Sequence, residues 1–475
     1  MPIGREVLFV FIIVFSHFMT QAAFSQAMGP IDIIAKSFPL VGGRNDHGAW
    51  SIAGYALTSG TFILIAGRLG DIIGHKRIFS IGYGWFAIWS ALTGFSVYAH
   101  SLILYDICRA MQGIGPALLV PNGLALLAGA YPPGMKKNLL FSLFGWMAPA
   151  GFVSGAAFGG LFAQKLWWPW IFWSFAGGCL TLFIASFFII PENVTMRPEK
   201  APSFDWAGCV TGVAGLVFIN VAVTNGPLYG WGTPHVYFLA IIGLFFMLAF
   251  AWIEKRAKNP LLPVRDLNST VAYILACVAL GWGAFGIWLF YTFRFLQQVR
   301  HATPLMVAAQ YAPAPISGLI AAGMTGFLLS HVPVSLVNLL SMIAFFSGVI
   351  IATFLPVHQS YWHQMFVSIV VMPFGMDMSF PAATIVLSNH MSPENQGMAA
   401  SLVVTTVNYS ISIALGIAGT VEMVMMKKGH GFDTMVHSLK GGYWAGVCMA
   451  GAGILLGMVF FIRTLRKEGW KLLDE

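Results

Sequence analysis

Two ionisable residues stand alone in long apolar stretches, where a charge needs a chemical reason. Arg109 lies in YDICRAMQGIGPALL and Asp377 in VVMPFGMDMSFPAAT. Charges in apolar surroundings are costly and typically mark ion or proton pathways. Burial favours the neutral form of a carboxylate, and a nearby cation favours the charged form. We therefore predict that Asp377 carries a proton and that Arg109 is its gate or relay partner; the alternative is that Asp377 only hydrogen-bonds a neighbouring helix.

Other polar residues in apolar stretches, Gln112 among them, are weaker candidates for lining a substrate cavity. His17 is followed about one helical turn later by Thr20 and Gln21, although a lone histidine is more often a packing group than a ligand. The second half of the chain adds four candidates: Tyr291, Arg294, Asn408 and Tyr409. Three further acids fall near predicted outer helix ends, where a solvated or interfacial role is expected: Asp32, Asp106 and Glu422.

Four charged residues and a histidine fall in one short segment of this otherwise apolar chain, GRLGDIIGHKR at residues 67–77. Its basic residues Arg68, Lys76 and Arg77 are typical of a turn held on the cytoplasmic side of a membrane. They do not explain Asp71. A carboxylate at a helix end can pair with cations and with the positive N-terminus of a neighbouring helix, and can release them when that helix moves. Asp71 is therefore predicted to be a latch between helices.

Composition indicates the elements that carry these residues. Of the 475 residues 58% are hydrophobic and only 9% are charged, too few for the surface of a soluble chain of this length. Apolar runs recur that are long enough to cross about 30 Å of hydrocarbon as helices, and they lack the alternation of a β-barrel. Fourteen transmembrane helices are predicted, near residues 7–28, 49–69, 78–98, 102–130, 138–163, 170–190, 206–224, 235–254, 271–296, 304–329, 333–355, 362–388, 398–425 and 441–464.

The distribution of Lys and Arg predicts the orientation. With the N-terminus in the cytoplasm, inside segments hold 16 of the 25 Lys and Arg and outside segments hold eight. This bias indicates that both termini are cytoplasmic. The net charge of +8 is then mostly topogenic and predicts no binding of nucleic acid.

The sequence shows no pattern for a metal, a cofactor or an enzyme. The five cysteines, all in predicted spans, have no paired spacing and are expected to be free thiols: Cys108, Cys179, Cys209, Cys277 and Cys448. A paired-histidine box is missing, which argues against an integral-membrane enzyme. No phosphate-binding P-loop is present, which argues against an ATP-driven pump.

Three motifs in order resemble those of the major facilitator superfamily. The spacing of Gly67, Leu69, Asp71, Gly74, Lys76 and Arg77 resembles that family's loop between its second and third helices. RAMQGIGPA, with Arg109, Gln112, Gly113 and Gly115, resembles its R-x-x-Q-G-x-G motif. GFVSGAAFGG, with Gly151, Gly155, Gly159 and Gly160, resembles its antiporter motif, which brings two helices into close contact. Fourteen spans and further stretches such as CRAMQGIGPALLVPN resemble the 14-spanner drug:proton antiporters, in particular the fungal aminotriazole- and boron-resistance exporters.

The chain departs from these motifs at three positions. Ile72 replaces a basic residue of the loop, and Ala156 replaces the proline of the antiporter motif. The second loop of the same type, predicted in GFLLSHVP, has Ser330 in place of the carboxylate. The latch is therefore expected on one half of the protein only. The missing proline weakens the prediction of antiport but not that of transport.

The resemblance implies two six-helix bundles, at residues 1–192 and 269–475, with two linking helices and their connectors at 193–268. It implies a monomeric transporter in the plasma membrane, with the vacuolar membrane as alternative. Inward proton flow would drive the export of a small solute, xenobiotic or metabolite by alternating access. The alternatives are an importer or facilitator of a small nutrient, and a transporter-like membrane sensor.

Overall fold

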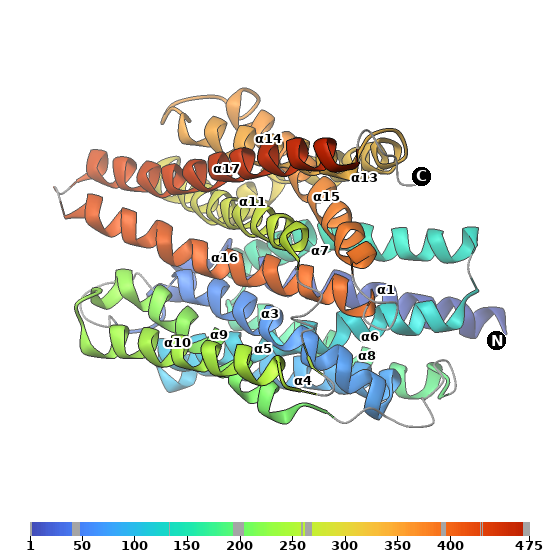
Figure 1. The fold of residues 1–475 in the computed structure, drawn as a ribbon. Helices are drawn as coiled ribbons and strands as arrows, with labels where there is room; N and C mark the ends of the chain where they lie inside the picture. Colours follow the sequence, from blue (N-terminus) through green and yellow to red (C-terminus); the bar gives the residue numbers. More distant parts are fainter. Residues whose placement is uncertain are drawn as a thin grey trace. The chain divides into compact units, whose positions relative to one another are not determined.

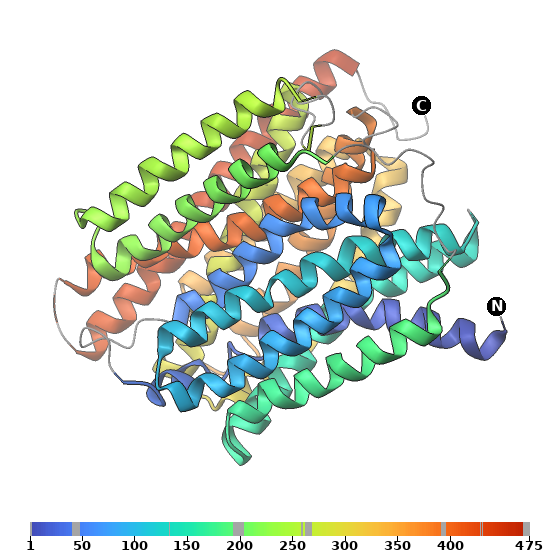
Figure 2. The ribbon, with the colours of Figure 1, turned by 90° about the horizontal axis from the view of Figure 1, so that it is seen from below.

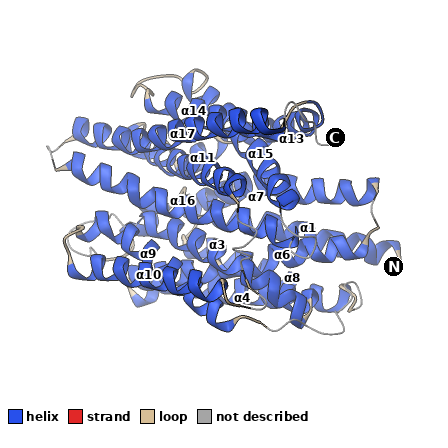
Figure 3. Cartoon of the chain, viewed as in Figure 1, coloured by secondary structure: helices blue, strands red, loops and turns tan. Residues whose placement is uncertain are grey.

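The computed structural model describes residues 2–39, 48–132, 134–192, 204–257, 260–261, 268–390, 396–427, 429 and 431–468. Every regular element among them is a helix (Figures 1 and 3). Fourteen helical segments of this part of the chain are long and apolar enough to cross a membrane. Each overlaps one of the predicted spans, so the expected all-helical membrane fold is confirmed. The stretches 193–203 and 262–267, which belong to the predicted connectors, lie outside the described residues.

The chain divides into two compact units. The first comprises residues 1–217 with 256–261, and the second comprises residues 218–255 with 262–475. The first unit contains α1 (Ile3–Ser25), α2 (Ile31–Lys36), α3 (Gly48–Ile73), α4 (His75–Phe95), η1 (Ser96–Ala99), α5 (Leu102–Gln112), α6 (Ile114–Ala130), α7 (Met135–Lys165) and α8 (Pro169–Ile189). Helices α5 and α6 together form the fourth span, which is interrupted at Gly113.

The second unit repeats this order of spans. It contains α11 (Ser269–Arg294) with the π-helical turn η3 (Phe295–Val299), α12 (Pro304–Gln310), α13 (Pro313–His331), α14 (Val334–Thr353), α15 (Gln364–His390), α16 (Gln396–Met426) and α17 (Phe432–Glu468). Helix α9 (Trp206–Tyr229) begins in the first unit and ends in the second, which also holds α10 (Pro234–Glu254).

Three pairings of spans recur in both units. The first span packs on the fifth, the second on the fourth and the third on the sixth. In the first unit these pairs are α1 with α7, α3 with α6 and α4 with α8; in the second they are α11 with α16, α13 with α15 and α14 with α17. The matching pairs indicate two copies of one six-helix arrangement.

The helices α9 and α10 form a hairpin that lies beside α16 (Figures 1 and 2). Gly243 of α10 abuts Ile219 of α9. Ser412 of α16 donates a hydrogen bond to Asn220 Oδ1 at 3.0 Å, and Trp231 Nε1 donates one to Thr420 Oγ1 at 3.2 Å. Polar contacts therefore attach the end of α9 and the following turn to the second unit.

The seam between α1 and α7 is a contact between helix backbones. A β-carbon at Gly151 would meet the backbone of Phe18, and one at Gly155 would meet the backbone of Ala22. One turn further on, Gly159 lies equally close to the Gln26 carbonyl. Because lipid provides no hydrophobic force between helices, small residues that permit close van der Waals contact hold such seams together. The predicted role of Gly151, Gly155 and Gly159 in close packing agrees with this geometry, and Gly160 is buried beside them.

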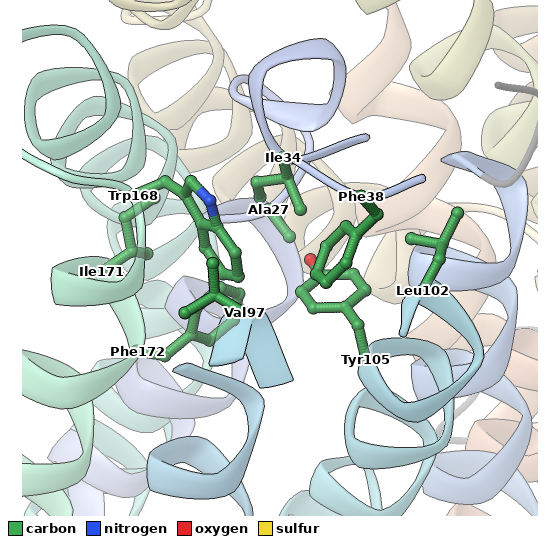
Figure 4. Packing of buried hydrophobic residues seen from close by; sticks show 9 residues of the cluster. All are labelled: Ala27, Ile34, Phe38, Val97, Leu102, Tyr105, Trp168, Ile171 and Phe172. Carbon is green, nitrogen blue, oxygen red and sulfur yellow. The ribbon is translucent and has the colours of Figure 1, made fainter. Parts of the chain in front are cut away.

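Aromatic residues close one end of the first unit. Trp168 and Phe172 of α8 and its preceding turn, Phe38, and Tyr105 of α5 gather around Ala27 (Figure 4). The Trp168 indole N–H donates to Ser37 Oγ at 2.9 Å, so the buried ring has a partner for its polar edge. This cluster fixes the N-terminal part of α5, the helix that carries Arg109.

Substitution of Gly155 by Ala is expected to destabilise the protein by about 1–3 kcal/mol, because the added methyl group meets backbone that cannot rotate away. Thermal unfolding of the purified protein in detergent measures the effect. Gly145→Ala is the matched control, since nothing lies within 4 Å of its added methyl on the same helix. Equal melting temperatures of the two variants would show that the seam does not require a glycine.

Candidate functional site

Arg109 is fully enclosed in the first unit. Its Nε donates to the Ser51 carbonyl at 3.3 Å, and Nη1 donates to Gln112 Oε1. The guanidinium carbon lies 4.9 Å from the centre of the Tyr55 ring, and it also faces Phe172. Nη2 is buried and has no hydrogen-bond partner among the described residues. The charge is thus held rigidly, with one donor free to bind an anion, a water molecule or a carboxylate.

Gln112 extends this network to α4. Its Nε2 donates to Ser90 Oγ at 2.6 Å, and Ser90 donates in turn to the Phe86 carbonyl. The R-x-x-Q spacing places both side chains on one face of α5, so that the amide orients the guanidinium. Gln112, a candidate for lining the substrate cavity, thus contacts Arg109 and Ser90 among the described residues.

The span bends away from regular geometry immediately after this pair. A β-carbon at Gly113 would collide with the Tyr55 carbonyl and Thr58 Oγ1 of α3. Thr58 Oγ1 also donates a hydrogen bond to the Ala110 carbonyl at 2.5 Å, which joins the side chain of α3 to the α5 backbone. The glycine of the motif therefore lets α3 approach the break between α5 and α6.

The charged segment 67–77 forms the turn between α3 and α4. Gly74 has a φ of 112°, a conformation that L-residues with a side chain rarely adopt, which explains the glycine at this position. Asp71 lies 3.9 Å from Arg68 Nη1 and 3.4 Å from His75 Nε2. Lys76 donates to the Phe187 carbonyl at the end of α8.

The two remaining motif residues of this turn are Arg77 and Gly67. The Arg77 side chain is exposed, and Gly67 is half-buried within α3.

A second cluster of polar side chains lies at the start of α1. Glu6 accepts hydrogen bonds from Lys136 Nζ at 2.5 Å and from the Tyr131 hydroxyl at 3.0 Å. Burial together with the hydrogen bond to Glu6 raises the pKa of Tyr131 to about 12, so its phenol remains a donor at physiological pH. The N-terminal end of α1 is thereby tied to the α6–α7 turn.

Asp377 occupies the seam between α13 and α15 in the second unit. A β-carbon at Gly318 would lie 3.1 Å from Asp377 Oδ2, so the carboxylate rests directly against the α13 backbone. Asp377 is half-buried, and no described side chain donates a hydrogen bond to it or forms an ion pair with it. A carboxylate without a donor in apolar surroundings favours its protonated form.

An apolar groove of about 680 Å³ opens beside this seam. Its walls include Ile316 and Ser317 of α13 and Phe366, Val370 and Phe374 of α15. Phe374 lies one turn before Asp377, and Ser317 directly precedes Gly318. The groove therefore ends close to the one carboxylate of this helix pair, and much of its wall is exposed apolar side chain such as Ile316 and Trp362.

The candidates Tyr291 and Arg294 meet an acid that the sequence did not connect with them. Arg294 Nη1 and the Tyr291 hydroxyl each donate to Glu422 Oε2 at 2.8 Å, joining α11 to α16. The side chains of the ion pair are 16% and 14% exposed. Glu422, expected to be solvated or interfacial, is instead largely enclosed. Its 128-residue separation from Arg294 gave no local signal of this pairing.

The candidates on α1 and α16 have mostly local partners. His17 Nδ1 lies 2.9 Å from the Phe144 carbonyl of α7, and the two rings stack. Thr20 donates to the His17 carbonyl, and Asn408 Nδ2 donates to the Val404 carbonyl of its own helix. Gln21 and Tyr409 are half-buried. The structure thus does not gather His17, Thr20 and Gln21 into one cluster.

Sequence reasoning also missed several partners of the predicted residues. The backbone carbonyl of Ser51 carries no signature in a sequence, and Asn122, which binds His75, lies 47 residues from it. Tyr55, whose ring faces Arg109 and whose carbonyl meets Gly113, could have been found only from the packing of α3 against α5.

Helices of this number and pairing, with buried charges at the fourth span of each unit, define a polytopic membrane transporter. The sequence pattern described as Major Facilitator Superfamily matches residues 10–417. The chain belongs to this superfamily.

Relatives and solved structures are similar over nearly the whole chain. The low affinity ammonium transporter of Saccharomyces cerevisiae is 49% identical, with 99% of this chain and 91% of that protein covered. The efflux pump terJ of Aspergillus terreus is 41% identical (98% and 90% covered), and the aminotriazole resistance protein of Saccharomyces cerevisiae is 35% identical (98% and 85% covered). These relatives confirm the resemblance to the fungal exporters. An auto-inhibited peptide transporter of the POT family shares the fold, with a TM-score of 0.69 at 13% identity and 98% and 97% coverage.

Removal of either member of the Arg294–Glu422 pair is expected to destabilise the protein by about 3–5 kcal/mol, because the remaining charge stays buried without its partner. Thermal unfolding of Arg294→Gln, Glu422→Gln and the double variant measures this coupling. The double variant should be more stable than the sum of the two single losses predicts. Arg463→Gln, at an exposed arginine of α17, is the control. Single variants as stable as this control would disprove the coupling.

Proposed function

We propose that this protein exports a small solute, xenobiotic or metabolite in exchange for protons. The observation that carries the proposal is Asp377, a half-buried carboxylate without a donor, beside an apolar groove in the fourth span of its unit. The names of two relatives, an efflux pump and an aminotriazole resistance protein, support export. No step requires a cofactor or metal, and we propose that the protein is a transporter rather than an enzyme.

The proposed cycle uses the protonation of Asp377. When the seam is open to water, Asp377 can lose its proton and favour binding of a solute that offers a hydrogen-bond donor or a positive charge. When the seam closes, loss of hydration favours the protonated form and weakens that interaction. Arg109 acts in the first unit as the gate, because its charge is fixed by Gln112 and Ser51 while one donor is left unused.

A second candidate function is the uptake of a small nitrogenous nutrient. It is favoured by the 49% identity with a low affinity ammonium transporter. Both functions fit the superfamily. They differ in whether the accumulation of solute depends on an imposed proton gradient.

We further propose that both termini are cytoplasmic, that the protein acts as a monomer, and that it lies in the plasma membrane rather than the vacuolar membrane. The bias of Lys and Arg toward the predicted inside segments supports this orientation. The division into 1–192, 193–268 and 269–475 stays a prediction.

Flux in proteoliposomes tests the function. Purified protein is reconstituted, and the movement of labelled 3-amino-1,2,4-triazole and of methylammonium is followed with and without an imposed pH difference. Proton-coupled export predicts that aminotriazole accumulates against its gradient only when the pH difference is present. Flux of either compound that is unaffected by the pH difference would contradict antiport and favour a facilitator.

Asp377→Asn is expected to abolish accumulation driven by the pH difference, because an amide cannot exchange the proton while it keeps the size of the side chain. Exchange of labelled for unlabelled solute at equal concentrations should continue. Asp433→Asn, at an exposed carboxylate at the start of α17, is the matched control and should leave accumulation unchanged. Unaltered accumulation in Asp377→Asn would assign the proton to another group.

A further inference from the structure

A hydrogen-bonded chain runs through the turn between α3 and α4. His75 Nδ1 lies 2.8 Å from Asn122 Oδ1 of α6, and His75 Nε2 lies 3.4 Å from Asp71 Oδ1 of α3. The histidine side chain is only 14% exposed. Gly70 leaves the space for this contact, since a β-carbon there would collide with both Asn122 and His75. His75 thus bridges two helices from the first residue of a third.

The orientation of Asn122 decides which ring nitrogen of His75 carries a proton. Asn122 Nδ2 donates to two carbonyl groups, that of Ala66 at 3.1 Å and that of Leu118 at 2.8 Å. Turning the amide around would place its oxygen against these two oxygens. Oδ1 therefore faces His75 and can only accept, so Nδ1 must be the donor.

The other ring nitrogen then faces an acceptor as well. A neutral imidazole with its proton on Nδ1 would turn the lone pair of Nε2 toward the Asp71 carboxylate. An imidazolium donates from both nitrogens and also pairs with the carboxylate charge. The two contacts are satisfied together only when His75 is doubly protonated.

We infer that His75 is a proton-binding site of this transporter, distinct from Asp377, and that its proton closes a link from Asp71 through His75 to Asn122. Loss of that proton as the pH rises leaves Asn122 bound to Nδ1 but ends the attraction to Asp71. Asp71 then keeps only Arg68, at 3.9 Å on its own helix. The link between α3, α4 and α6 is therefore intact below the transition and weakened above it.

The surroundings of His75 support a simple titration. The charged groups facing it from α3 are Asp71 and Arg68, and α6 contributes the uncharged Asn122. Lys76, its neighbour on α4, bonds to the Phe187 carbonyl of α8, and Arg77 is exposed. Asp71 is therefore the acid whose removal should alter proton binding most.

The link is placed where it can affect transport. Asn122 and Arg109 belong to the same span, on either side of the break at Gly113, and Asn122 also holds α3 through Ala66. A closed link restrains the turn, so we expect slower exchange between conformations at low pH. An exposed or partly exposed ion pair of this kind corresponds to about a two- to five-fold change in rate.

Hydrogen–deuterium exchange at the imidazole C2 position, measured by mass spectrometry on the full-length protein in detergent, tests the proton site directly. Asp71→Asn should move the release of the second His75 proton to lower pH, because the carboxylate that faces Nε2 has been replaced by an uncharged amide. The exposed His437 is the internal control in the same samples and should not respond. A His75 titration unchanged by Asp71→Asn would overturn the inference. This readout does not depend on the proposed export function.

Solute exchange tests the consequence. Counterflow of labelled aminotriazole is measured in proteoliposomes with equal pH on both sides, so that no proton gradient drives it. The wild-type rate should rise about two- to five-fold with pH across neutrality. His75→Arg, always charged, should keep the low rate at every pH. His75→Asn, which can still donate to Asn122, should keep the high rate.

The pair of variants makes the result decisive. Opposite, pH-independent rates for the two variants support the link, and His437→Asn should retain the wild-type pH profile. Coinciding rates of His75→Arg and His75→Asn, or a pH step that persists in His75→Asn, would overturn it. If aminotriazole is not transported at all, the proposed function fails while the exchange measurement at His75 still decides the proton site.

Discussion

The hydrocarbon interior of a bilayer offers no hydrogen-bond partner, and this constraint shapes every polar feature of the chain. Helices satisfy the backbone internally, which is why apolar runs of this length become helices. Polar side chains must then find partners on neighbouring helices. Arg109 uses a carbonyl, an amide and an aromatic face, and Glu422 uses an arginine and a tyrosine. Asp377 stands apart because the described residues offer it no donor, so its protonation state is its remaining means of avoiding the cost of a buried charge.

The two units solve the same packing problem with different chemistry. In the first unit, the seam between the first and fifth spans is lined by glycines of α7 that contact the α1 backbone. In the second unit, the glycines lie on the first span instead: Gly283 and Gly286 of α11 abut α16. There the seam also carries the Arg294–Glu422 pair, close to the π-helical turn η3. π-Helical turns are frequent at functional sites. Both seams therefore combine close packing with an ionic contact: the Arg294–Glu422 pair of the second seam is largely enclosed, whereas the Lys136–Glu6 pair of the first is more exposed.

The spans could be predicted from the sequence because hydrophobic length is a property of one segment at a time. The motif residues were found for the same reason: Gly67 to Arg77 and Arg109 to Gly115 are short, continuous patterns. Their partners were not found, because each depends on the pairing of distant helices. Asn122 reaches His75 only after α4 and α6 pack together, and Glu422 reaches Arg294 only after α11 and α16 do. A sequence shows which polar groups lie in apolar stretches, while the fold decides which of them are enclosed and which donor meets which acceptor.

The turn between α3 and α4 illustrates this difference between what the sequence indicates and what the fold decides. Its glycines and basic residues suffice to form a tight turn, and Asp71 with Arg68 would already be an ion pair within one helix. His75 changes the situation, because it connects that carboxylate to an amide on α6 whose orientation is fixed by two carbonyls. A lysine or arginine at this position would keep the connection at every pH. An imidazole keeps it only while protonated, so the same geometry that stabilises the turn also makes it respond to acidity near neutrality. The charged turn is thus a structural contact whose strength is set by a proton, and it acts on the span that holds Arg109.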